Sequence, residues 1–265
     1  LDKAMVARMF ELPSEAYIAE QFACSHPQRI HAARELLRSQ LAHALESVLL
    51  QVYRSIPATT EYRYDEQEVG KRALRNTCLN YLMALDNNAV HAIALAHYNS
   101  ATHMTDQLAA LRAIAHCNHP HRQSVLERFY QQWQCEALVV DQWFGVQASS
   151  PADSVLQDVA GLLSHPAFEI TNPNKVRALI GAFANGNPAG FHRQDGSGYA
   201  FLAEQVITLN AINPQIASRM VIPLTRWRRY EAPFGDHMRA ALQRIAAQPL
   251  SPDVFEHVNK SLQEA

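Results

Sequence analysis

The sequence lacks a run of basic residues, and its charges nearly balance. Lysine and arginine number 23 against 25 aspartates and glutamates, which leaves a formal charge of −2. Nothing in this balance favours a phosphate backbone or an anionic membrane surface as a partner. No apolar run approaches the ~18 residues that a membrane-spanning helix needs, and residues 1–4 form no signal-peptide pattern. We therefore expect a soluble cytoplasmic protein that binds neither nucleic acid nor a membrane, and a chain that begins inside a longer protein.

The sequence motifs of common catalytic sites are also missing. None of the 13 histidines lies in a His-Glu-x-x-His pattern, in which two histidines one helical turn apart bind zinc and the glutamate acts as base. The sequence has no Gly-x-x-x-x-Gly-Lys-Ser/Thr loop, no Gly-x-Gly-x-x-Gly loop and no Gly-x-Ser-x-Gly nucleophile turn. We predict no catalytic residue and no cofactor in this chain.

Cysteine and histidine are present, but without the spacing of a metal site. Cys24, Cys78, Cys117 and Cys135 are scattered, and we interpret them as reduced core thiols rather than as a disulfide framework. The segment 116–121, His-Cys-Asn-His-Pro-His, contains possible ligands, but it spans a helix end and lacks the spacing of a structural zinc site. The sequence therefore predicts no metal site.

Apolar residues instead recur every three or four positions along most of the chain. This spacing predicts amphipathic helices, beginning with a long helix over 30–52 and a second over 68–85. The same pattern predicts helices over 89–100, 105–116, 122–133, 137–147, 154–163, 173–183, 199–209, 216–227, 237–247 and 254–262. No segment alternates apolar and polar residues as a half-buried strand does.

About a dozen helices with short connections favour antiparallel hairpins stacked side by side, because each hairpin buries its apolar face only against its neighbours. We therefore predict an all-α fold, an armadillo- or HEAT-like α-solenoid, forming one domain over 1–265. No strict internal repeat is visible. The stretch 185–198 contains several Gly and Asn residues and is predicted to be an exposed loop, either a lip beside a site or an ordinary connector.

Two segments, 172–177 and 213–219, are similar to each other. Each has Asn-Pro, then an amide side chain, then an arginine about one turn later. Asparagine suits an N-cap and proline the first helical position, so each segment is predicted to start a helix. Helix-end N–H groups and a guanidinium suit recognition of a carbonyl or carboxylate group. The pair indicates a binding surface; the alternative is that Asn-Pro only starts helices and both arginines are solvated.

Several blocks in order resemble a known family. They are Glu61-Tyr62-Arg63, Lys71 to Asn76, Met104-Thr105-Asp106 with Leu108 to Leu111, Asp141 to Phe144, Thr171 to Phe183, and Asp195 to Tyr199. Together these blocks resemble the C-terminal helical domain of the bacterial alanyl aminopeptidase (aminopeptidase N) family, zinc enzymes that remove N-terminal residues from peptides. The resemblance covers essentially the whole chain.

The resemblance implies a role without catalysis for this chain. In that family the zinc ligands, the general base and the residues that hold the substrate amino group lie in an upstream catalytic domain. The helical domain caps the active site and lines the cavity that peptide substrates enter. The resemblance carries over to Arg177, Gln215 and Arg219 as residues facing this cavity, and Asn174 lies on the same helix face as Arg177. We thus predict a substrate-binding set of these four residues in a chain that is inactive alone.

Two other roles remain open. The chain could be an independent α-solenoid that docks protein partners through its concave face. It could also be a purely structural cap with no substrate contact.

Overall fold

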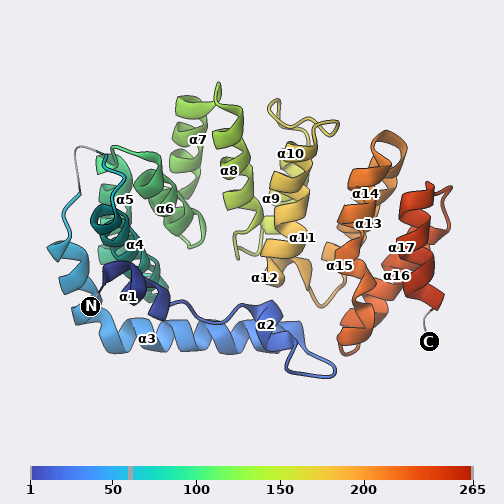
Figure 1. Cartoon of the computed structure of the whole chain (residues 1–265), viewed down its shortest axis with the longest axis horizontal. Helices are drawn as coiled ribbons and strands as arrows, with labels where there is room; N and C mark the ends of the chain where they lie inside the picture. Colours follow the sequence, from blue (N-terminus) through green and yellow to red (C-terminus); the bar gives the residue numbers. More distant parts are fainter. Residues whose placement is uncertain (1, 59–61, 264–265) are drawn as a thin grey trace. The chain divides into compact units, whose positions relative to one another are not determined.

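The computed structural model describes residues 2–58 and 62–263, and these residues form helices and the turns that join them (Figure 1). Apart from one isolated bridge between Ser25 and Tyr230, the described residues contain no β-structure, which confirms the predicted all-α fold class. The first elements are α1 (Lys3–Met9), α2 (Glu15–Ala19), α3 (Pro27–Ser55), α4 (Glu66–Leu82), η1 (Met83–Leu85), α5 (Asn88–Ser100), α6 (Met104–Ala115) and α7 (Arg122–Trp133).

The remaining elements are α8 (Ala137–Ala148), α9 (Val155–Leu162), α10 (Pro173–Val176), η2 (Arg177–Gly181), α11 (Ala182–Gly186), α12 (Pro188–Phe191), α13 (Ser197–Ile212), α14 (Pro214–Met220), α15 (Ile222–Thr225), η3 (Trp227–Arg229), α16 (Phe234–Ala246) and α17 (Pro252–Gln263). The chain divides into two compact units. Unit 1 comprises Leu1–Ser14 and Ala32–Gln131, and unit 2 comprises Glu15–His31 and Gln132–Ala265.

Unit 1 is built from helices that pack on α4. Both α1 and α6 contact α4, and α5 packs on α6. Gly70 allows α1 to approach, because a β-carbon at this position would lie 3.0 Å from the Ala4 backbone nitrogen. Side-chain caps fix the helix starts: Asp65 accepts a hydrogen bond from the Glu68 N–H at α4, and Asn87 accepts from the Val90 N–H at α5.

Unit 2 is built from stacked helix pairs. Helix α8 packs on α9 and η2, α13 packs on α14 and α16, and α17 packs on α14 and α16 (Figure 1). Aromatic side chains fill the space between these layers, and Phe144, Phe183, Tyr199 and Phe234 are each 0% exposed. Each helix pair therefore buries its apolar face against the next pair, as expected for a helical solenoid.

Residues 15–31 join unit 2 through backbone pairing. The Ser25 N–H donates to the Arg229 carbonyl at 2.9 Å, and the Glu231 N–H donates to the Ser25 carbonyl at 3.0 Å. The Gln28 side chain donates to the His192 carbonyl at 3.2 Å. These bonds hold the start of α3 against the segments around α12 and η3.

The expected exposed loop over 185–198 is wrong for most of its length. Asn187 is 2% exposed, because its side-chain N–H groups donate to the carbonyls of Ala148 and Ser150 at 2.8 and 2.7 Å. Its Oδ1 accepts from the Gly190 N–H at 2.8 Å and so starts α12, a third Asn-Pro helix start. Gly198 is also buried, and a β-carbon there would lie 2.3 Å from the Phe191 carbonyl oxygen. The polar composition of this stretch serves internal hydrogen bonds.

The helix expected over 216–227 is interrupted. Helix α14 ends at Met220, and the chain continues as the short α15 and η3. Pro223 has no N–H to donate to the Arg219 carbonyl four residues earlier, so a continuous α-helix cannot form here.

Glu61 of one resembling block lies outside the residues that the structure describes. The single domain over 1–265 stays a prediction. Among the described residues, no helix combines the length and the apolar character needed to cross a membrane.

Candidate functional site

The first Asn-Pro segment starts a helix as predicted. Asn172 is the N-cap of α10, and its Oδ1 accepts a hydrogen bond from the Asn174 N–H at 2.9 Å. Pro173 occupies the first turn. Asn174 Oδ1 then accepts from Arg177 Nη1 at 3.0 Å, and both side chains are exposed. The structure therefore joins two of the predicted site residues in one exposed pair.

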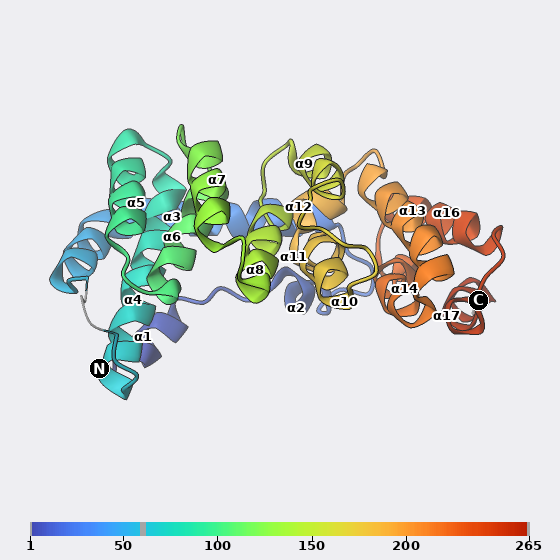
Figure 2. The ribbon, with the colours of Figure 1, turned by 90° about the horizontal axis from the view of Figure 1, so that it is seen from above.

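A buried ion pair on the opposite side of this helix fixes its orientation. Lys175 is 8% exposed, and its Nζ lies 2.8 Å from Asp141 Oδ1 on α8. The same nitrogen donates to the Ala137 carbonyl at 3.3 Å and lies 5.6 Å from the ring centroid of Phe144. Figure 2 shows α10 beside α8. Because Lys175 is held inward, its neighbours Asn174 and Arg177 are directed to solvent.

The helix that begins at Pro173 changes its geometry at Arg177. The segment η2 is π-helical over Arg177–Gly181, and α-helical structure resumes in α11. Single π-helical turns are uncommon and are frequently found at functional sites. Arg177 is the first residue of this wider turn.

The second Asn-Pro segment has a free polar face. Asn213 caps α14 by accepting from the Ile216 N–H at 3.2 Å, and Pro214 occupies the first turn. Gln215 and Arg219 are exposed and lie one turn apart on one helix face. Within the described part of the chain, neither side chain has a hydrogen-bond or ion-pair partner.

The fold brings the two segments together in unit 2. A β-carbon placed on Gly181 would lie 3.7 Å from Met220 Sδ and 3.8 Å from Arg177 Cβ. Since Met220 directly follows Arg219, the end of α14 lies against η2 at this point. The helices that carry the two predicted arginines are therefore neighbours.

The chemistry of this surface rests on side chains more than on helix ends. Asn172 and Asn213 each accept a hydrogen bond from one first-turn N–H group. Fewer N–H groups are therefore free to bind a ligand at these helix starts than the sequence led us to expect. Two guanidinium and two amide groups are left as donors for a carbonyl or carboxylate oxygen. Guanidinium and amide groups offer donors and, in the amides, a weakly basic oxygen. The surface can bind and orient a ligand, but it cannot supply a general base.

Unit 1 contains a buried polar network that was not predicted from the sequence. Arg75 and Asp106 are 8% and 3% exposed, and Arg75 Nη1 lies 3.5 Å from Asp106 Oδ2. Arg75 also donates to the Tyr53 hydroxyl at 3.3 Å, which lies 2.9 Å from His97 Nδ1. Asn76 donates to the other Asp106 oxygen at 3.0 Å. Arg75, Asn76 and Asp106 belong to blocks that carry the family resemblance, which was the available signal, but Tyr53 and His97 join them only in the fold.

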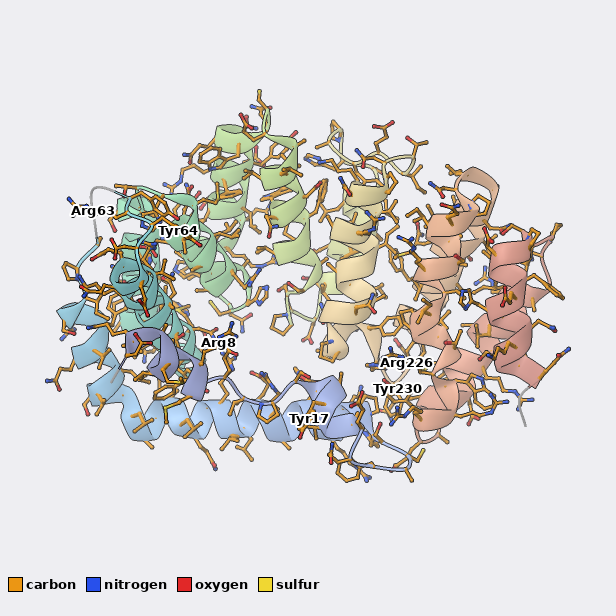
Figure 3. The ribbon with its side chains drawn as sticks, viewed as in Figure 1. Arg8, Tyr17, Arg63, Tyr64, Arg226 and Tyr230 are labelled. Atoms are coloured by element: carbon orange, nitrogen blue, oxygen red, sulfur yellow. The ribbon has the colours of Figure 1, made fainter. Side chains whose placement is uncertain are left out.

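A half-buried histidine in unit 2 was also missed. His192 Nδ1 lies 2.7 Å from the Tyr199 hydroxyl, and the centroids of the His192 and Tyr230 rings are 4.9 Å apart. Figure 3 labels Tyr230 with Arg226 near the end of α15. Burial lowers the pKa of His192 to about 4 and raises the pKa of Tyr199. The imidazole is therefore neutral at pH 7 and shares a hydrogen bond with the Tyr199 hydroxyl.

The cysteines differ from the prediction in their exposure. All four are free thiols. Cys78 is buried and Cys117 is half-buried, but Cys24 and Cys135 are exposed, so the prediction of core thiols is wrong for these two. Both exposed cysteines lie in turns between helices rather than on a packed helix face.

Comparison with known protein families gives one match over nearly the whole chain. Residues 1–263 match the family described as a domain of unknown function (DUF3458_C) with ARM repeats. Armadillo repeats are stacked helices, so this description agrees with the predicted solenoid.

Similar proteins carry aminopeptidase names. Aminopeptidase N of Escherichia coli is 41% identical over 263 residues, and that of Caulobacter vibrioides is 41% identical over 262 residues. These alignments cover 99% and 98% of this chain, which spans 30% of the length of each relative. The solved structure of Legionella pneumophila aminopeptidase A in complex with aspartic acid matches with a TM-score of 0.91 and 27% identity, over 100% of this chain and 32% of that one. The sequence resemblance to this family is thereby confirmed.

Proposed function

Because the chain belongs to the DUF3458_C family of ARM-repeat domains, we propose that it is the C-terminal domain of a zinc aminopeptidase that caps the active site and lines the peptide cavity. Its similarity to a limited part of proteins named aminopeptidase N supports this proposal. The zinc and the groups that cleave the peptide belong, in this proposal, to an upstream catalytic domain, and the enzyme acts in the cytoplasm.

The observation that carries the cavity role is the contact between η2, which continues α10, and the end of α14. The Met220 side chain lies beside Gly181 there, so the two helices that begin at the Asn-Pro pairs share one region of unit 2. A peptide held by its amino end at a distant zinc extends its later residues away from the metal. Arg177 and Arg219 then bind backbone carbonyls or the terminal carboxylate, and the amides of Asn174 and Gln215 add further donors. Binding here orients the substrate and takes no part in bond cleavage.

Exposed apolar side chains in unit 1 support an upstream partner. On α1, Met5 and Met9 are 59% and 72% exposed and lie one turn apart. On α3, Leu37 and Val48 are 47% and 51% exposed and lie about three turns apart on one face. Exposed apolar side chains that form one surface are typical of surfaces that another protein part covers. We propose that the upstream catalytic domain packs on this part of unit 1.

A split-enzyme assay tests the proposed function. The purified 265-residue chain is assayed with a chromogenic amide of alanine or leucine, first alone and then mixed with the upstream portion of the protein. We expect turnover only in the mixture. Hydrolysis by the chain alone would contradict the proposal, and so would a mixture whose activity equals that of the upstream portion alone. Binding of unrelated proteins by a chain that never associates with the upstream portion would favour the independent scaffold.

We predict that Arg219→Ala in the full-length enzyme weakens the use of long peptides selectively. The value of kcat/KM should fall about tenfold for peptides with several residues beyond the cleaved bond, which corresponds to ~1.4 kcal/mol of lost binding to the guanidinium. A dipeptide or a chromogenic amide should be unaffected, because it does not extend to Arg219. The matched control is Arg112→Ala, since Arg112 is an exposed arginine on α6 in unit 1. Equal effects of Arg219→Ala on short and long substrates would reject the role.

A further inference from the structure

Three side chains from different parts of unit 1 lie close together. Asp86 follows η1, His91 lies in α5, and Cys117 follows α6. One ligand atom of each residue lies within 4.8 Å of those of the other two, and His91 Nε2 is 2.8 Å from Asp86 Oδ1. We propose that Asp86, His91 and Cys117 bind one divalent zinc ion.

The donor set fits zinc better than magnesium or calcium. Zinc accepts thiolate, imidazole and carboxylate ligands together, whereas magnesium and calcium take oxygen donors. Two ligand atoms on a tetrahedral zinc lie about 3.5 Å apart, so small side-chain rotations bring this group to bonding distance. Binding replaces the Cys117 S–H bond by an S–Zn bond and releases one proton to water. The hydrogen bond from the Cys117 thiol to the Ile114 carbonyl, at 3.5 Å, is given up in this step.

His91 has unused bonding capacity at this place. The residue is 9% exposed, and one ring nitrogen, Nε2, faces Asp86. The other, Nδ1, is buried and has no hydrogen-bond partner in the described part of the chain. A buried polar atom without a partner is uncommon and destabilises a fold by itself. Rotation of the ring would allow this imidazole to bind a metal ion instead of Asp86 alone.

His119 holds the site without being a ligand. Its Nε2 donates to the His91 carbonyl at 3.0 Å, and its Nδ1 accepts from the His121 N–H at 3.0 Å. Both ring nitrogens are thus occupied by backbone groups. Its ring centroid lies 4.8 Å from that of His91. His119 is therefore a positioning residue that fixes the segment carrying Cys117 against α5.

The sequence prediction of no metal site considered only ligands within 116–121. Two of the three proposed ligands, Asp86 and His91, come from the turn and helix about thirty residues earlier. Only Cys117 belongs to the histidine-rich segment. The proposal does not depend on the peptide-binding role of unit 2.

Cobalt and zinc titration of the 265-residue chain tests the site. We expect Co²⁺ to bind one per chain with a thiolate-to-cobalt charge-transfer band, and Zn²⁺ to displace it and raise the Tm. Cys117→Ser should abolish the band, and Asp86→Asn should weaken zinc binding about tenfold or more. Asparagine tolerates the left-handed backbone of residue 86, where φ is 43°, and the side chain of Asp86 is 48% exposed. This variant should therefore remain folded.

The matched control is Cys135→Ser, since Cys135 is an exposed thiol in unit 2. It should leave both the band and the affinity unchanged. No band in the unaltered chain, a band that survives Cys117→Ser, or an affinity that Asp86→Asn does not change would each overturn the proposal. Circular dichroism of each variant establishes that the fold is retained.

Discussion

Replacing Asp106 by asparagine is expected to lower the free energy of unfolding of unit 1 by about 3 kcal/mol, the lower end of the range for breaking a buried ion pair. Asp106 is 3% exposed, and its carboxylate lies next to the buried guanidinium of Arg75. The amide keeps the shape of the side chain and can still accept the hydrogen bond from Asn76. It removes the negative charge, so Arg75 is left as a buried cation without its counter-ion.

Urea-induced unfolding followed by far-ultraviolet circular dichroism measures this effect. The control is Glu46→Gln, the same carboxylate-to-amide change at an exposed position of α3 in unit 1. We expect Glu46→Gln to change the free energy of unfolding by less than about 0.5 kcal/mol. If both variants unfold at the same urea concentration, the network in unit 1 does not stabilise the fold in the way we infer.

Acidification from pH 6.5 to pH 4 is expected to destabilise both units. Burial holds the pKa of His97 and of His192 at about 4, below the ordinary value of 6.5. Between these two pH values the unfolded chain binds a proton at each histidine and the folded chain does not. Stability therefore rises with pH across this window and is fully present above about 6.5. Each histidine contributes a loss of about 3 kcal/mol by pH 4, to order of magnitude.

His192→Asn tests this prediction in unit 2. All three tryptophans, Trp133, Trp143 and Trp227, belong to unit 2, so tryptophan fluorescence follows the unfolding of that unit. The asparagine side chain can accept the hydrogen bond of the Tyr199 hydroxyl, but it does not titrate. Between pH 6.5 and pH 4 the free energy of unfolding should fall less in the variant than in the unaltered chain. The difference should equal the loss assigned above to one histidine. An equal loss in both proteins would show that His192 is not the responsible group.

Local signals explain which parts of the fold could be predicted. Asn172 and Asn213 cap helices because an Asn-Pro pair and the N–H groups that follow it suffice for a cap. Asn187 obeys the same rule, yet its burial escaped prediction, because its partners at Ala148 and Ser150 lie almost forty residues away. The break after Met220 was foreseeable from Pro223, which cannot donate within a helix.

The candidate peptide-binding site was also predictable only in part. The sequence alone indicates that Arg177 and Arg219 each follow an Asn-Pro helix start. Their placement on neighbouring helices depends on the contact between Gly181 and Met220, which no periodicity predicts. Likewise, the network at Arg75 collects side chains from α3, α4, α5 and α6, so its members are recognisable only after these helices have packed.

The π-helical turn determines which change of length this part of the chain can accept. Such a turn holds one residue more than an α-helical turn and lies within a helix that continues on both sides. Removing one residue from 177–181 should therefore leave a regular α-helix, in which Lys175 still reaches Asp141 and Phe183 still packs on Phe201. A residue lost from an α-helical stretch instead turns one flank by about 100° relative to the other. Shortening should therefore be tolerated better within this turn than in the regular helices of unit 2.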